Sequence, residues 1–521
     1  MTPGSNSPNI KTTKSCALKD YMQKNAPQCC TATFNGRSDV IIVEGENIIF
    51  TTGSKSSIGE KIDSIILCKL KPMFKTTDTV VILFDDPKES WKLNLKQTDK
   101  KRYFKNYPKL TLNTESKVHD WEWIMKQPEN KNTLKKLFGQ TLLEKAAVIL
   151  DFEQELYING IEDHGIVQRI SKSSEGIHIE TMDTEWSQML GESDTKIFHL
   201  LELFSKKGMG RFLVYSKDTD VKVLSVYWQS RLKLDEIVVR SGSVLLPSYF
   251  YPSKFLCYLK SVFDSSNEDM QRHAKSFLNT FILFGCDLCP GWVNMSHAVG
   301  LQTWENITKT LAKPVETQEE FIFLILKCYE KKNSGIKRWL NIDDLEIPLE
   351  TRVRQARSII KTFRGVESES VPLKSVIDLQ IKRSLFITQF WIQKECFLDP
   401  NDFGWKQRDG NSFDIILQDE EDPLFSVPQS LLLGCACKKK CTNKCACIKD
   451  SNRYNKCSRI TCKFCLCYKR VQDGANENLL ASEEYQQYMD DLSSNSETDS
   501  GSESEKYNSS LYLDDSESDM D

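Results

Sequence analysis

The sequence lacks a long hydrophobic run: no stretch reaches the roughly 18 apolar residues that a membrane-spanning helix needs. The N-terminal segment MTPGSNSPNIKTTKS also lacks the apolar centre of a secretory signal. Repeats at the periods of solenoid proteins are absent as well. We therefore expect an intracellular protein with no membrane partner. Inside cells disulfides are rare, so we interpret the 18 cysteines as metal ligands or buried thiols.

Charge is distributed unevenly along the chain. Residues 472–521 hold 15 acidic residues and one basic residue, Lys506, a net charge of −14. The whole chain carries −4, which leaves +10 for the residues before the acidic segment. A basic body favours a nucleic-acid partner over an ordinary solvated surface, the alternative reading. The acidic segment has too few apolar residues to form a core, and its Ser and Thr residues followed by acids suit an acidophilic kinase.

The length of 521 residues predicts two to four structural units. Composition and apolar spacing place the boundaries between them. In chain order we expect a disordered arm at 1–37, an α/β domain at 38–300 with an insert at about 104–190, a helical region at 301–400, a connector at 401–433, a cysteine-rich module at 434–470 and a disordered acidic tail at 471–521.

Short apolar runs alternate with helical spacing in the first half of the chain. The runs lie at 39–50, 79–87, 210–226 and 277–291, and helical spacing lies at 57–74 and 192–208. Continuous apolar runs of this length fit strands that are buried on both faces of a parallel sheet. The alternation predicts an α/β fold, with a mostly parallel twisted sheet flanked by helices and right-handed crossovers.

Carboxylates follow each of the four apolar runs. The acids at the ends of the runs are Glu44, Glu46, Asp85, Asp86, Asp218, Asp220 and Asp287. Two more, Glu192 and Asp194, begin the helix that precedes the third run. The carboxyl ends of parallel strands meet at one edge of a sheet, where gathered acids repel one another unless a cation neutralises them. Oxygen ligands without His or Cys suit Mg²⁺ or Mn²⁺, and two such ions are a common arrangement for phosphodiester hydrolysis. Helix caps and surface charge are the alternative reading.

At these residues the sequence resembles the flap-endonuclease/XPG-type nucleases, within the wider PIN-like fold. The similar segments are VIIVEGENIIF (40–50), the strand and basic stretch at 80–104, the helix, strand and Asp-x-Asp at 191–225, and ILFGCDLCPGW (282–292). Their order and spacing also agree over about 260 residues. The resemblance implies a Mg²⁺-dependent endonuclease or 5′-nuclease that acts on structured or single-stranded DNA.

The resemblance also implies a role for each matching residue. Glu44 and Asp85 would be ligands of a first metal ion, and Glu192 and Asp194 would bridge the ions or bind them through water. The second ion would be held by Asp218, Asp220 and Asp287. The basic residues that steady the scissile phosphate would be Lys92 together with one of Lys100, Lys101 or Arg102.

Three departures from the family pattern favour a second hypothesis. Glu44 is one methylene longer than the usual Asp, and Asp86 stands where the family has Gly. The segment after residue 291 lacks the Gly-x-Gly of the family's helical hairpin, whose backbone N–H groups approach a DNA phosphate. The second hypothesis is a catalytically inactive PIN-like factor that binds DNA or RNA. A third is an interaction scaffold whose nucleic-acid element is the cysteine segment alone.

From about residue 192 onward the chain also resembles uncharacterised proteins of animal mobile elements or large DNA viruses. These proteins combine a similar acidic core with an Asp-Phe-Gly-Trp stretch, here Asp402–Trp405, and a cysteine-rich end. This resemblance covers more of the chain and implies less chemistry.

Nine cysteines lie within 33 residues near the C-terminus, in the order C-x-C-x₃-C-x₃-C-x-C-x₉-C-x₄-C-x₂-C-x-C. Thiolates without His favour tetrahedral Zn²⁺, and three ions are satisfied if three sulfurs bridge, so we expect two to three Zn²⁺. The segment resembles the tesmin/TSO1-like CXC module, which docks on DNA. The expected ligands are Cys435, Cys437, Cys441, Cys445, Cys447, Cys457, Cys462, Cys465 and Cys467.

Basic residues surround these cysteines: residues 435–470 hold 11 Lys or Arg and one acid, Asp450. Such a surface contacts phosphates and supplies affinity rather than sequence specificity. A purely structural zinc knot or a protein contact is the alternative. The expected nucleic-acid contacts are Lys438, Lys439, Lys440, Lys444, Arg453, Tyr454 and Arg459. DNA binding leads us to expect a nuclear protein.

Overall fold

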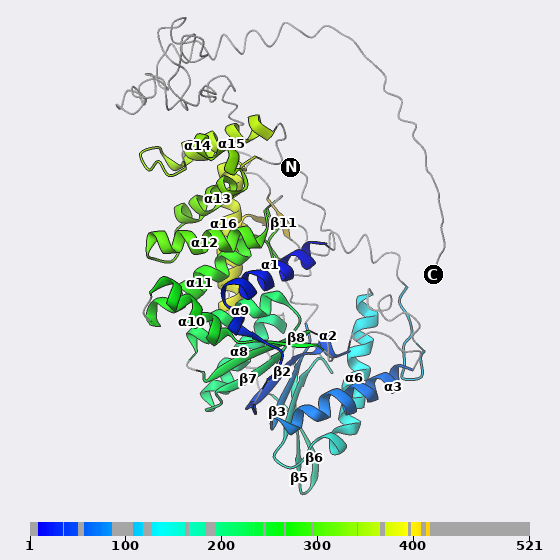
Figure 1. Cartoon of the computed structure of the whole chain (residues 1–521). Helices are drawn as coiled ribbons and strands as arrows, with labels where there is room; N and C mark the ends of the chain where they lie inside the picture. Colours follow the sequence, from blue (N-terminus) through cyan, green and yellow to red (C-terminus); the bar gives the residue numbers. More distant parts are fainter. Residues whose placement is uncertain are drawn as a thin grey trace, which may run out of the picture. The chain divides into compact units, whose positions relative to one another are not determined.

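The structure is a computed structural model, shown in Figure 1. The chain divides into two units, residues 1–425 and 426–521, and the described residues all lie in the first. Among the helices of the described residues, none has the length and apolarity needed to cross a membrane. The described residues are 9–34, 36–49, 57–85, 108–117, 127–161, 166–182, 193–232, 234–242, 246–264, 267–286, 288–292, 295–340, 342–364, 370–393, 398–407 and 413–416.

Within the described residues, a nine-stranded sheet forms the centre of the first unit, in the order β1-β9-β8-β7-β2-β3-β4-β5-β6. The five central strands, β8, β7, β2, β3 and β4, pair in parallel, and the outer strands on both sides pair antiparallel. The fold is therefore α/β, as predicted. The strands are β1 (Cys30–Thr31), β2 (Val40–Glu44), β3 (Thr79–Leu83), β4 (Glu155–Asn159), β5 (Val167–Ser173), β6 (Gly176–Thr181), β7 (Arg211–Tyr215), β8 (Glu236–Gly242) and β9 (Pro247–Phe250).

The strand order reverses at β2. From β2 the chain continues to β3 and β4 on one side, and it later returns to place β7 and β8 on the other. In open parallel sheets such a switch point leaves a crevice outside the carboxyl ends of the strands, where ligands bind. The first three predicted strands, β2, β3 and β7, are the three neighbours at this point.

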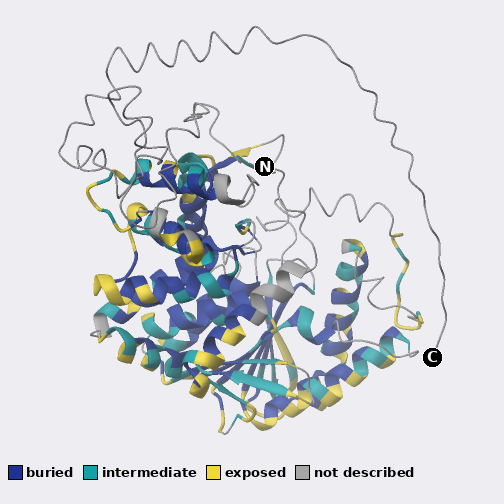
Figure 2. Ribbon diagram, turned by 45° about the horizontal axis from the view of Figure 1, so that its top comes forward, coloured by how far each residue is buried: buried dark blue, intermediate teal, exposed yellow. Residues whose placement is uncertain are grey.

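Helices cover both faces of the sheet, which explains the continuous apolar runs. Alternate residues of β2 belong to different cores: Val40 and Ile42 face one core, and Ile41 and Val43 face the other. The first core is covered by α8 (Ser193–Lys206), α9 (Thr219–Arg231) and α10 (Pro252–Phe263). The second is covered by α2 (Gly45–Ile49), α3 (Ile58–Ile65), η2 (Ile66–Leu70), η3 (Lys71–Lys75) and α6 (Pro128–Ile149). Figure 2 shows the central strands in dark blue between these helices.

Further helices extend the first core away from the sheet. Helix α11 packs against α16 and α12, and α12 packs against α13. A short two-stranded sheet follows, made of β10 (Trp405–Gln407) and β11 (Phe413–Ile415). The helices are α11 (Asn267–Leu283), α12 (His297–Leu311), α13 (Gln318–Lys332), α14 (Lys337–Leu340), α15 (Leu349–Arg364) and α16 (Lys374–Ile392).

Within 1–37, where the polar composition predicts a disordered arm, the described residues include a helix and a strand. Helix α1 (Asn9–Asn25) packs against α12, and β1 joins the edge of the sheet beside β9. Leu18, Tyr21 and Met22 are buried, and Tyr21 Oη donates to Glu305 Oε2 at 2.6 Å. These side chains lie on one face of α1 and dock it, although the segment as a whole is polar.

The apolar run at 277–291 is not a strand. Its first residues form the end of α11, where Phe277, Leu278 and Phe281 are fully buried. A helix surrounded by other helices is apolar on all sides, and its short runs read like those of a buried strand. The acid after this run, Asp287, therefore follows a helix and lies outside the described residues. The expected insert also differs, because β4 within it pairs in parallel with β3 and belongs to the central sheet.

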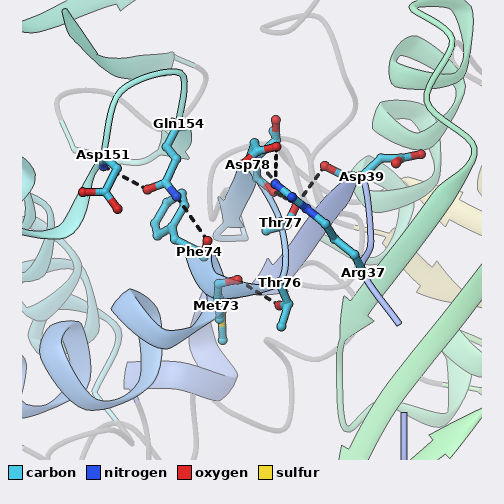
Figure 3. A network of polar contacts seen from close by, with 10 residues as sticks. Arg37, Asp39, Met73, Phe74, Thr76, Thr77, Asp78, Asp151 and Gln154 are labelled. Atoms are coloured by element: carbon cyan, nitrogen blue, oxygen red, sulfur yellow. Dashed lines mark hydrogen bonds and ion pairs between the residues drawn. The ribbon is translucent and has the colours of Figure 1, made fainter. Parts of the chain in front are cut away.

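Polar contacts close the amino end of the central strands (Figure 3). Thr77 Oγ1 donates to the carbonyl oxygen of Asp39 at 2.7 Å, and Arg37 forms an ion pair with Asp78. Asp39 Oδ2 accepts from the backbone N–H of Arg211 at 2.9 Å. These contacts align the starts of β2, β3 and β7, so the acids at this end have a structural role.

Candidate functional site

The carboxyl ends of β2, β3 and β7 bring acids from distant segments together. Glu44 is the last residue of β2 and lies opposite Leu83 of β3 in the parallel register. Asp85 follows two residues after Leu83, and Asp218 follows three residues after the end of β7. Glu44 continues the alternation of Val40 and Ile42, so its side chain is on the face that α8 and α9 cover.

Asp85 joins the end of β3 to the start of α8. Its Oδ1 accepts from the backbone N–H of Ser193 at 2.8 Å and from Ser193 Oγ at 2.7 Å. Ser193 is the first residue of α8, where unsatisfied N–H groups and the helix dipole favour a negative charge. The next residue, Asp194, is in the first turn of α8. Asp194 is only 3% exposed.

Ser216 joins the end of β2 to the turn after β7. Its Oγ donates to Glu44 Oε2 at 2.8 Å and accepts from the backbone N–H of Asp218 at 3.0 Å. Asn47 Nδ2 donates to the same oxygen of Glu44. Asp218 caps α9, because its Oδ1 accepts from the backbone N–H of Asp220 at 3.0 Å. Ser193 thus links Asp85 to the start of α8, and Ser216 links Glu44 to the turn before Asp218.

The backbone just before Asp85 is also held in place. The side chain of Asn159, in β4, donates to the carbonyl oxygen of Phe84 at 2.9 Å and accepts from its N–H at 2.6 Å. Lys135 Nζ, in α6, donates to the carbonyl oxygen of Asp85 at 3.2 Å. Lys135 also lies 3.3 Å from a carboxylate oxygen of Glu46, so Glu46 belongs to an ion pair with α6.

The donor set fits a hard divalent cation chemically. Asp194 and Asp220 are each 3% exposed, and an ionised carboxylate that is buried this far needs a compensating positive charge or hydrogen bonds. Carboxylate oxygens without His or Cys are the ligands of Mg²⁺ and Mn²⁺. Within the described residues, however, no three His, Cys, Asp or Glu side chains are arranged closely enough to hold an ion.

Many of the predicted site residues lie outside the described residues, and the structure does not test them. Among the acids these are Asp86, Glu192 and Asp287, and the rest are Lys92, Lys100, Lys101, Arg102, the nine cysteines between 435 and 467 and the basic residues Lys438, Lys439, Lys440, Lys444, Arg453, Tyr454 and Arg459. The described ones, Glu44, Asp85, Asp194, Asp218 and Asp220, all lie at the ends of β2, β3 and β7 or in the first turns of α8 and α9.

The sequence did not lead us to the residues that position these acids, Ser193, Ser216 and Asn159. Ser193 stands between two acids at the start of a helix, and Ser216 stands two residues before Asp218. Ser at the first turn of a helix or before an Asp is a signal for capping, so both had a local signal. Asn159 had none, because its partner Phe84 is 75 residues away.

Comparisons with known proteins add little to this geometry. No protein-family model matches the chain, and no curated protein matches it. Among solved structures, the chain is similar to the catalytic core of Rad2 in complex with a DNA substrate, at 11% identity and a TM-score of 0.32. The match covers 69% of this chain and 98% of that chain. At this score the likeness carries no argument, and the fold and the site rest on the strand order and the contacts given above.

Proposed function

We propose that this protein is a Mg²⁺- or Mn²⁺-dependent nuclease that hydrolyses a phosphodiester bond in structured or single-stranded DNA. The observation that carries the proposal is the pair of serine contacts, Ser193 with Asp85 and Ser216 with Glu44. They hold Asp85 against the start of α8 and Glu44 against the turn after β7, at the switch point of a parallel sheet, where a ligand site is expected.

Each acid has a defined task in this proposal. Glu44 and Asp85 present carboxylates whose orientation the serine donors fix, and Asp194 and Asp220 contribute charge from buried positions. Bound divalent ions would supply Lewis-acid stabilisation of the charge that develops on the phosphate. Burial of the surrounding side chains excludes water and strengthens each electrostatic contact. Lys92 and one of the basic residues at 100–102 would hold the scissile phosphate.

The cysteine segment enters the proposal as a separate DNA contact. Its support is the spacing of its nine cysteines and the density of Lys and Arg between them. Because so short a segment has almost no apolar core, two to three Zn²⁺ would supply its folding free energy. A DNA substrate would place the protein in the nucleus.

The test compares an acid of the site with an acid at the other end of the same strand. Asp85→Asn keeps an oxygen that can accept from Ser193 but removes the charge. Asp78→Asn alters an exposed acid at the start of β3 and is the matched control. With Mg²⁺ or Mn²⁺ and labelled flap or single-stranded DNA, we expect Asp85→Asn and Asp220→Asn to lose about 100-fold or more of the hydrolysis rate.

The control variant and the wild type should cleave at the same rate, and EDTA should abolish both activities. Equal cleavage by wild type and Asp85→Asn would mean that another group, or a contaminant, does the chemistry. Rates should be measured at low enzyme concentration with the variants purified identically.

A second candidate function keeps nucleic-acid binding without hydrolysis. It is favoured by the hydrogen bonds on Glu44 and Asp85, because an acid that caps a helix or bonds two side chains already has a structural reason to be there. This candidate predicts DNA binding by the wild type with no cleavage in either metal, and no change in binding for Asp85→Asn.

A further inference from the structure

A row of aromatic and basic side chains crosses the sheet beside the candidate site. In the register, Tyr215 of β7 lies opposite Arg240 of β8, which lies opposite Tyr249 of β9. Directly paired residues of neighbouring strands have side chains on the same face. This is the face of Leu213 and Val238, opposite to the one that α8 and α9 cover.

Within the described residues, the helices on that face have their main strand contacts with the other half of the sheet. Their contacts are those of α2 with β2, η3 with β3, and α6 with β5 and β6. Within the described residues, Tyr215, Arg240 and Tyr249 are accordingly half-buried, whereas Leu213 and Val238 are buried. We call the row of Phe34, Tyr215, Arg240 and Tyr249 the aromatic–basic face.

The rings and the guanidinium of this face stack on one another. Arg240 Cζ lies 4.5 Å from the ring centre of Tyr215 and 6.0 Å from that of Tyr249. Phe34 stacks on Tyr249 with ring centres 5.8 Å apart and planes 25° apart. Arg240 Nε is buried and has no hydrogen-bond partner within the described residues. A guanidinium packed between rings is held in one orientation and keeps its charge for an anion.

Two lysines bring further positive charge to the same place. Burial lowers the pKa of Lys69, in η2, and the nearby charges of Lys217 and Arg240 lower it further. Three segments far apart in the sequence therefore contribute positive charge to this part of the surface, which favours the approach of an anion. Lys217 directly precedes Asp218, so this positive cluster adjoins the acids of the candidate site.

We propose that the aromatic–basic face and its lysines bind a single strand of DNA that leads to the acids at the end of β2, β3 and β7. Phosphates would contact Lys69, Lys217 and Arg240, and bases would pack on Tyr249 and Phe34, as in other single-strand sites built from cations and rings. A second copy of this face is a poor partner, because it would bring the same cations together. The inference rests on the proposed function for the identity of the ligand.

The test measures binding without catalysis. A fluorescent single-stranded DNA oligonucleotide is titrated with the full-length protein in EDTA, and anisotropy gives the affinity at several salt concentrations. The variant Lys69→Gln/Lys217→Gln is compared with Lys71→Gln/Lys75→Gln, which removes the same charge from exposed positions in η3. Loss of two phosphate contacts should reduce the slope of log K against log salt by about 1.4, at about 0.7 per contact. The control pair should leave the slope unchanged.

A second variant tests the rings. Tyr249→Leu should weaken binding by about fivefold or more and leave the salt slope unchanged, because stacking releases no counterions. A melting curve for each variant shows that the fold is retained.

Three results would overturn the inference. The first is an equal salt slope for the wild type and Lys69→Gln/Lys217→Gln, and the second is an equal effect of the two lysine pairs on that slope. The third is that these variants weaken the binding of single-stranded RNA but not of single-stranded DNA. Since no divalent metal is present, these results are independent of cleavage. If Asp85→Asn and Asp220→Asn hydrolyse DNA as fast as the wild type, the nuclease proposal fails. The binding result would be unaffected.

Discussion

Removing the hydroxyl of Ser193 tests whether Asp85 joins β3 to α8 as the structure shows. Ser193→Ala deletes the Oγ donor 2.7 Å from Asp85 Oδ1 and leaves the backbone donor at 2.8 Å in place. A hydrogen bond to a charged group contributes about 1.5–3 kcal/mol, and the donor that remains keeps part of the cap. We therefore expect a loss of about 1.5 kcal/mol in the free energy of unfolding.

The assay is urea unfolding followed by tryptophan fluorescence, in a double-mutant cycle with Asp85→Ala. The coupling energy should be about 1 kcal/mol or more, because each substitution removes the same contact. Ser205→Ala is the control in the same helix, since Ser205 Oγ donates only to the carbonyl oxygen of Glu202 at 2.8 Å. A coupling energy near zero would show that Asp85 and Ser193 do not bond, and the assembly of the site from β3 and α8 would be wrong.

Three further predictions concern the packing of α2, the docking of α1 and the cysteine segment. Gly45→Ala should lower the free energy of unfolding by about 1–3 kcal/mol, because a Cβ at Gly45 would lie 2.3 Å from the ring of Phe84. An unchanged free energy of unfolding in urea would contradict this packing. Burial raises the pKa of Glu305, but hydrogen bonds from Lys309, Tyr21 and Tyr258 outweigh burial, and the pKa is lowered overall. The ionised Glu305 therefore stabilises the fold at neutral pH, and this stabilisation is lost as the pH falls below the usual pKa range of Glu. Amide exchange in α1 should therefore accelerate in acid, and Tyr21→Phe should accelerate it at neutral pH; an unchanged rate in both would show that this contact does not dock α1. Elemental analysis of the purified chain should find two to three Zn²⁺, and Cys435→Ser/Cys437→Ser should lower that number, whereas metal-free protein would end the zinc assignment.

The part of the fold that the sequence predicts is the part with buried strands. Runs such as Val40–Val43 and Val80–Leu83 are apolar on consecutive residues because both faces of the sheet are covered, and that signal is local. The same signal failed at 277–291, because the buried last turns of α11 contain short apolar runs like those of a strand. Helix α1 was missed because its docking depends on α12, almost 300 residues later in the chain.

The candidate site shows a similar division. The acids Glu44, Asp85 and Asp218 were found because they follow strands, and strand ends can be read from the sequence. Which oxygens bond to which donors depends on how β2, β3 and β7 lie beside one another, so the roles of Ser193 and Ser216 needed the structure. The aromatic–basic face was invisible for the same reason, because Tyr215, Arg240 and Tyr249 become neighbours only through strand pairing.

Direct measurement of Mn²⁺ binding tests the central claim, that the acids at the ends of β2, β3 and β7 hold divalent ions. Electron paramagnetic resonance counts free Mn²⁺ in titrations of the full-length protein, without DNA and without turnover. We predict that the wild type and Asp78→Asn bind Mn²⁺ equally, and that Asp85→Asn and Asp220→Asn each lose affinity by about tenfold or more. Absence of Mn²⁺ binding by the wild type, or equal binding by all four proteins, would contradict the metal site and the nuclease proposal with it.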